Sequence, residues 1–146
     1  MTIREAVMKL FTVVPSQGWT LDGAADSLIQ LAAQTRSLSV GMVREFESQS
    51  KQFQVIENDQ LLQTGDSTPN RMIRPLLAFL ANKAAKETGV EFNVYGGRYS
   101  FTRPGSRGMV RIDAEFENTM HSQRITFVTT KVPAKRKPSP KKKKVT

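Results

Sequence analysis

The chain has 146 residues, of which 38% are apolar, and its formal net charge is +9. This length and apolar content suit one ordinary domain, or two very small ones, with a modest core. The absence of cysteine excludes disulfide bonds, thiolate zinc sites and a cysteine nucleophile. It also fits a reducing compartment, so we expect an intracellular protein.

The charge is distributed unevenly along the chain. Residues 131–146 contain eight basic residues and no acidic residue, so this segment alone carries +8. Residues 1–66 have a net charge of −3 and residues 67–130 a net charge of +4. The basic character therefore belongs mainly to the C-terminal segment, and a basic binding face elsewhere must be argued residue by residue.

The first two segments read as helices. Apolar residues between Ile3 and Val14 recur at the i, i+3, i+4, i+7 spacing of one helical face, and Pro15 ends the pattern. Thr20 is placed to cap a second helix whose apolar face begins at Leu21. Two amphipathic helices are therefore expected before residue 35.

The next stretch, TRSLSVGMVREFESQ, predicts a third helix. Leu38, Met42 and Phe46 fall one helical turn apart. A second interpretation remains open, because the apolar residues of 21–50 also fit a heptad and could form one long coiled-coil helix. Gly41 weakens a helix and favours a break in that stretch.

A β-hairpin is predicted to follow. The apolar segments 53–56 and 60–63 flank the turn-forming residues 57–59. In pattern, three helices and a hairpin resemble the winged-helix variant of helix-turn-helix domains. The resemblance implies that the third helix is the recognition helix and the hairpin the wing.

The second half predicts a helix packed on an antiparallel sheet. Turn-forming residues at 66–70 mark a boundary, and an amphipathic helix over 72–88 ends at Gly89. The pair Gly96 and Gly97 predicts a tight hairpin between the first two strands. The four predicted strands lie at residues 90–95, 98–103, 109–117 and 123–130.

The predicted fold class is therefore α+β. We expect a winged-helix-like unit at residues 1–66 and a unit of one helix and a four-stranded sheet at residues 67–130. Proline and lysine exclude packing from residue 131 onward, so we expect residues 131–146 to be disordered.

Catalytic chemistry has little support in the residue inventory. The chain has one histidine, His121, and no glycine-rich nucleotide-binding loop, so we expect no enzyme activity, no cofactor and no metal. Asp113, Glu115 and Glu117 share one face of a predicted strand, where three carboxylates could hold Mg²⁺. We favour the other interpretation, in which they pair with Arg98, Arg111 or Arg124 on neighbouring strands.

Arginines in and beside the predicted hairpins are the main candidates for nucleic-acid contact. Tyr95 is predicted to share a face with Arg98, and a guanidinium beside an aromatic ring suits phosphate contact and base stacking. The predicted recognition helix adds two arginines, although Glu45 and Glu47 would repel phosphates. The candidate nucleic-acid-binding residues are Arg36, Arg44, Tyr95, Arg98, Arg103, Arg107, Arg111, Arg124, Lys135, Arg136, Lys137, Lys141, Lys142, Lys143 and Lys144.

The C-terminal segment contains a short recognisable element. Ser139-Pro140-Lys141-Lys142 resembles the repeats of linker-histone tails, which implies contact with the minor groove of A·T-rich DNA. The same basic runs would satisfy a nuclear-import signal, or tether the chain to DNA, RNA or an anionic membrane. No apolar anchor accompanies the charge, so a membrane partner is not expected.

We therefore expect a small non-enzymatic protein that binds nucleic acid, DNA before RNA, as a regulator or organising factor of a virus, a bacterial nucleoid or a nucleus. The alternative is an adaptor or inhibitor that binds a protein partner, or forms a homodimer, through residues 1–66 and is tethered to nucleic acid by its tail. A third interpretation is an RNA or single-strand binder that uses Tyr95 and Arg98.

Overall fold

The computed structural model describes residues 2–12, 20–44, 51–65 and 73–132. Across these residues it is a mixed α+β fold with three helices and one antiparallel sheet of six strands. The strand order in the sheet is β3-β2-β1-β6-β5-β4. The elements are α1 (Ile3–Thr12), α2 (Leu21–Ala32), β1 (Ser37–Arg44), β2 (Lys51–Glu57), β3 (Gln60–Gly65), α3 (Ile73–Thr88), β4 (Gly96–Gly105), β5 (Gly108–Asn118) and β6 (Ser122–Lys131).

The three observed helices lie where the first, second and fourth predicted helices were expected. The residues at their ends explain where they begin and end. The amide of Thr2 donates to Glu5 Oε1 at 2.8 Å and the amide of Glu5 donates to Thr2 Oγ1 at 3.1 Å, which is a reciprocal capping box for α1. The predicted cap of α2 is confirmed, because Thr20 Oγ1 accepts from the amide of Gly23 at 3.0 Å. Gly89, with φ of 79°, ends α3 in the left-handed conformation that glycine tolerates.

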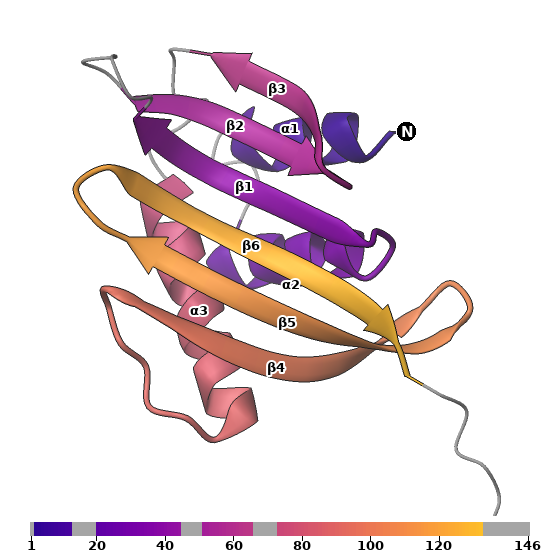
Figure 1. Cartoon of the computed structure of the whole chain (residues 1–146). Coiled ribbons are helices and arrows are strands. Elements are labelled where there is room, and N and C mark those ends of the chain that lie inside the picture. The colour runs from indigo at the N-terminus through magenta and orange to yellow at the C-terminus, as the bar shows by residue number, and fades with distance from the viewer. Residues whose placement is uncertain (1, 13–19, 45–50, 66–72, 133–146) are drawn as a thin grey trace, which may run out of the picture.

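The core lies between the helices and one face of the sheet. Figure 1 shows α1, α2 and α3 on the same side of the sheet. Alternate residues of β1, β2, β4, β5 and β6 point toward them, as period-two alternation requires. The largest fully buried side chains are Phe53, Phe127, Leu28, Leu38, Leu76, Leu77, Leu80, Ile112, Ile125, Val7 and Val40.

The two halves of the chain contribute three strands each to the sheet, and β1 and β6 join them. β1 pairs with β6 in an antiparallel register that sets Leu38 opposite Phe127 and Val40 opposite Ile125. All four of these side chains are fully buried. The junction between the halves is therefore part of the core.

The predicted third helix is wrong, because residues 37–44 form the central strand β1. Leu38, Val40 and Met42 all point into the core, which is a period of two rather than the helical spacing of Leu38 and Met42 alone. The coiled-coil alternative for 21–50 is wrong for the same reason. Without a recognition helix, the winged-helix arrangement is not formed.

The predicted strand at 90–95 is also wrong. This segment is a link between α3 and β4, and the sheet has six strands rather than the predicted four. The amide of Val90 still bonds to the helical carbonyl of Ala85 at 2.9 Å, and Gly96 N donates to the Asn93 carbonyl at 3.2 Å in a turn. These local bonds replace the ladder that a Gly96-Gly97 hairpin would need.

The other predicted hairpins are confirmed. β2 and β3 are joined by Asn58 and Asp59, whose φ values of 50° and 68° suit a tight hairpin turn. β4 and β5 pair from Gly105↔Gly108 outward, so the predicted turn after Pro104 is present. The predicted core face of β5 is confirmed as well, since Phe116 is buried.

Several predictions lie outside the described residues. They concern the boundary at 66–70 and the disorder predicted for the tail, of which the structure describes only residues 131 and 132. No helix that the structure describes is long and apolar enough to cross a membrane.

Candidate nucleic-acid interface

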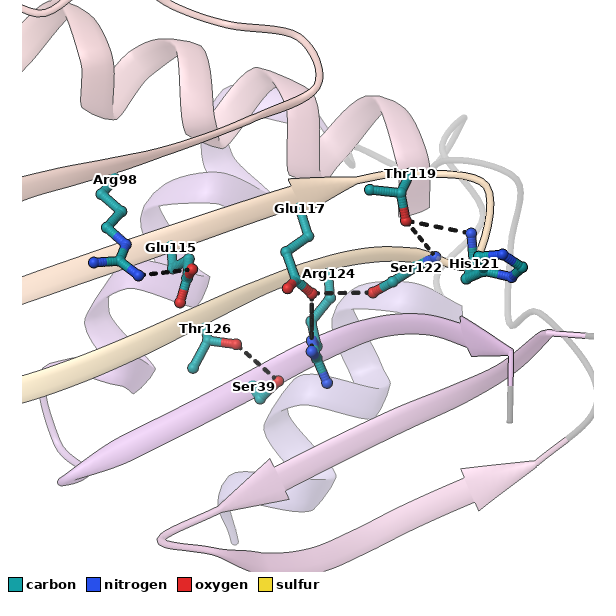
Figure 2. A network of polar contacts seen from close by, with 9 residues as sticks. All are labelled: Ser39, Arg98, Glu115, Glu117, Thr119, His121, Ser122, Arg124 and Thr126. Carbon is teal, nitrogen blue, oxygen red and sulfur yellow. Dashed lines mark hydrogen bonds and ion pairs between the residues drawn. The ribbon is translucent and has the colours of Figure 1, made fainter. Parts of the chain in front are cut away.

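The face of the sheet opposite the helices carries rows of charged side chains. Figure 2 shows Glu115 of β5 beside Arg98 of β4, with 3.4 Å between Oε2 and the guanidinium, and Glu117 beside Arg124 of β6. Arg124 donates from two nitrogens to Glu117 Oε1, at 2.8 and 3.1 Å. The predicted ion pairs between strand acids and arginines are confirmed.

Asp113 occupies the next outward position of β5 and is held by two donors. Ser100 Oγ donates to Asp113 Oδ1 at 2.5 Å and Arg111 Nε donates to the same oxygen at 3.0 Å. The Ser100 hydrogen bond, followed by that of Arg111, lowers the pKa of the Asp113 carboxyl, while burial opposes the shift. Asp113 is thus a stable anion on this face.

The outer sheet face is therefore close to neutral. Three arginines, Arg98, Arg111 and Arg124, stand beside the three carboxylates of β5. A phosphate approaching any of these arginines also meets a carboxylate, which offsets most of the attraction. Within the described residues no group of three or more acids or histidines is arranged to hold a metal ion.

Arg103 does not join the other arginines, although it lies on the same hairpin. Its guanidinium reaches Glu87 of α3 with two bonds, at 2.5 and 2.8 Å, and lies 4.9 Å from the centre of the Phe101 ring. The hydrogen bonds from Arg103 lower the pKa of Glu87. Arg103 thus attaches β4 to α3, and its charge is paired with Glu87.

Tyr95 and Arg44 lie near the turn between β5 and β6. Tyr95 is 75% exposed, and its carbonyl accepts from the amide of Asn118 at 3.0 Å. The amide of Arg44 donates to the carbonyl of His121 at 2.8 Å. Because Tyr95 lies in the link before β4, it does not share a strand face with Arg98 as predicted.

At the other end of the sheet, three cations line one hollow, which we call the basic hollow. Its volume is about 430 Å³, and its charged lining residues are Arg36, Arg107 and Lys131. They come from the link between α2 and β1, the turn between β4 and β5, and the last residue of β6. Figure 1 shows that these segments meet at the end of the sheet where β6 finishes.

Hydrogen bonds between segments that are distant in the sequence fix the α2–β1 link, which forms one wall of the basic hollow. Asn58 Oδ1 accepts from the amides of Arg36 and Ser37 at 2.9 and 3.0 Å. The amide of Thr129 donates to the Arg36 carbonyl at 2.9 Å, and Thr129 Oγ1 donates to the Ala32 carbonyl at 2.9 Å. The backbone that carries Arg36 is therefore fixed to both β6 and the β2–β3 turn.

The cations of the basic hollow differ from the arginines of the sheet face in their neighbours. Arg36, Arg107 and Lys131 are exposed, and in the part of the chain that the structure describes none of them has an ion pair. The lining of the hollow includes no acidic residue. Their positive charge is thus directed to solvent.

Of the predicted site residues, the structure brings Arg36 and Arg107 together. Lys131 was not a predicted candidate, and the strand pairing that places it next to Val110 explains its position. The seven basic residues from Lys135 to Lys144 lie outside the described residues.

No protein-family model matches the chain, and no curated protein matches its sequence.

Proposed function

We propose that this chain is a non-enzymatic nucleic-acid-binding protein, with DNA as the preferred partner, in which a polycationic segment and the body act together. The observation that carries the proposal is the place of the basic hollow. Lys131 lines the hollow and is followed by seven more basic residues within 132–146. Positive charge thus extends along the sequence from the body into the C-terminal segment.

This arrangement suits binding to a polyanion. Each phosphate that Lys or Arg neutralises releases condensed counterions, which gives affinity that does not depend on sequence. In the proposed division of work, the C-terminal segment supplies most of this affinity, while the body sets the position of the chain on the nucleic acid. The paired arginines of the sheet face contribute little.

The test compares the full chain with residues 1–132 on duplex DNA over a series of salt concentrations. The cut follows Val132 because its amide donates to the Met109 carbonyl at 3.1 Å. For each phosphate that the shortened chain no longer neutralises, the plot of log affinity against log salt should flatten by about 0.9. We expect a drop in affinity of about 10³ or more at low salt, whereas an unchanged slope would refute the proposed role of the segment.

A second candidate function is that of an adaptor that binds a protein partner. It is favoured by the exposed apolar side chains near the β5–β6 turn, where Tyr95 and Met120 are 75% and 76% exposed. This surface lies in the second half of the chain, not in residues 1–66. If the folded 1–132 chain binds neither DNA nor RNA, and a Tyr95→Ser variant of the full chain loses a captured protein partner, the adaptor function is favoured.

A further inference from the structure

We propose that the basic hollow is a binding site for one backbone phosphate of duplex DNA. This inference rests on the proposed function and makes it specific, because it assigns one phosphate contact of the body to Arg36, Arg107 and Lys131. The same chemistry would accept free inorganic phosphate or pyrophosphate, so these serve as probes.

The charge of the hollow selects an anion. Three cations line it without a carboxylate among the lining residues, which include the hydroxyl-bearing Ser106 and Thr130. A guanidinium presents donors in a planar fork that fits phosphate oxygens, and a lysine adds a point charge. Two guanidinium groups, an ammonium and two hydroxyls are a donor set for phosphate.

Side-chain donors offset part of the negative charge at the end of helix α2. Helix C-termini carry partial negative charge on their last carbonyl groups. Here the Ala32 carbonyl accepts from Thr35 Oγ1 at 3.0 Å and from Thr129 Oγ1 at 2.9 Å. Two hydroxyl donors thus satisfy one of the last carbonyl groups of α2.

The exposure of the cations points to a phosphate that belongs to a polymer. Sites for small molecules enclose most of the ligand surface. In the basic hollow Arg36, Arg107 and Lys131 are all exposed, so a bound phosphate would remain accessible on its outer side. A backbone phosphate needs that opening, because the sugar chain must enter and leave on either side of it.

The β2–β3 turn carries an acidic residue next in sequence to the lining residue Asn58. Asp59 follows Asn58 in the β2–β3 turn and is exposed, while only Asn58 lines the hollow. Glu57 and Asp59 flank Asn58 in the sequence, and Asp59 is the exposed one of the two. Replacing it with asparagine keeps a residue that tolerates positive φ and removes the charge, so Asp59→Asn should strengthen phosphate binding.

The experiment uses the full chain labelled with ¹⁵N and follows amide shifts during titration with inorganic pyrophosphate at constant ionic strength. We expect saturable shifts at Asn58, Ser106 and Thr130 in the wild-type chain. The apparent dissociation constant for pyrophosphate should rise at least tenfold in Arg36→Ala and Arg107→Ala. Arg98→Ala is the matched control, because Arg98 is an equally charged and exposed side chain on the sheet face. Shifts confined to residues outside the hollow would overturn the proposal.

Binding of the same variants to duplex DNA then distinguishes a failure of the phosphate site from a failure of the proposed function. Arg36→Ala and Arg107→Ala should each reduce the salt slope on duplex DNA by about 0.9, and Arg98→Ala should leave it unchanged. If pyrophosphate fills the hollow but the wild-type chain does not bind duplex DNA, the site stands as a free-phosphate site and the proposed function fails. If duplex DNA binds equally to all three variants, the function stands and the site is refuted. Preference for single-stranded RNA would overturn the assignment to duplex DNA.

Discussion

Gly41 shows how one residue sets the distance between two strands. A Cβ built on Gly41 would lie 2.3 Å from the carbonyl oxygen of Gln123 and 2.5 Å from Cα of Arg124. Both atoms belong to the backbone of β6, so they cannot move aside as a flexible side chain would. Gly41 is therefore required by the close approach of β1 and β6.

Gly41→Ala should destabilise the fold by about 1–3 kcal/mol, the usual range for extra atoms in a packed core. Chemical denaturation would measure the free energy of unfolding. Gly23→Ala is a suitable control, since its Cβ would meet a single side-chain oxygen, Thr20 Oγ1 at 3.0 Å. Equal stability of Gly41→Ala and wild type would contradict the pairing of β1 with β6.

The Ser100 hydroxyl should make stability depend on pH through Asp113. The folded pKa of Asp113 is lowered, chiefly by the hydrogen bond from Ser100. The stability that this gives is therefore present above the ordinary carboxyl pKa of about 4 and is lost as the pH falls through the lowered folded value. Ser100→Ala should raise the Asp113 pKa and reduce stability at neutral pH more than at pH near 2.

Carbon-detected NMR titration of the Asp113 carboxyl in wild type and Ser100→Ala would measure this shift. Ser106→Ala, an exposed serine of the β4–β5 turn, serves as the control. An unchanged Asp113 pKa in Ser100→Ala would show that the hydrogen bond is not its main cause.

The β2–β3 turn is an element whose side chain organises a distant segment. Asn58 combines positive φ with a side-chain oxygen that accepts from two amides of the α2–β1 link. Asn58→Ala should cost about 1–3 kcal/mol, because it adds backbone strain and removes both bonds. Asn58→Gly should cost less, since glycine accepts positive φ freely.

Thermal unfolding of the two Asn58 variants would compare these costs. The Asn58→Gly chain should also show larger amide shifts at Arg36 and Ser37 than at residues of β4. Identical stability of Asn58→Ala and wild type would contradict the anchoring role of the turn.

The errors at the element level have a physical cause. Leu38 and Met42 fit a helix when Val40 is ignored, and the same residues fit a strand when it is included. Strand pairing decides between helix and strand for this segment. β1 lies between β2 and β6, so its backbone hydrogen bonds are satisfied along both edges. Such long-range pairing has no local signal, whereas the Thr20 cap, the Gly89 end of α3 and the Asn58-Asp59 turn are local and were predicted correctly.

At the scale of the whole molecule, the basic hollow could be predicted only in part. Arg36 and Arg107 were candidates by residue type, but they are 71 positions apart in the sequence. The six-stranded order brings the α2–β1 link, the β4–β5 turn and the end of β6 together. The sequence pattern instead grouped Arg98, Arg103, Arg107, Arg111 and Arg124 in or beside the predicted hairpins. Among the residues that it describes, the structure pairs each of them except Arg107 with a carboxylate.

The central claim is that the body itself contacts nucleic acid, and one measurement tests it most directly. This is the affinity of the folded 1–132 chain for a short DNA duplex at low salt, with and without the Arg36→Ala and Arg107→Ala substitutions together. We predict weak, salt-dependent binding that falls at least tenfold in the double variant and is unchanged in Arg98→Ala. If the folded 1–132 chain does not bind the duplex, or if the double variant binds as well as the unsubstituted 1–132 chain, the claim is contradicted.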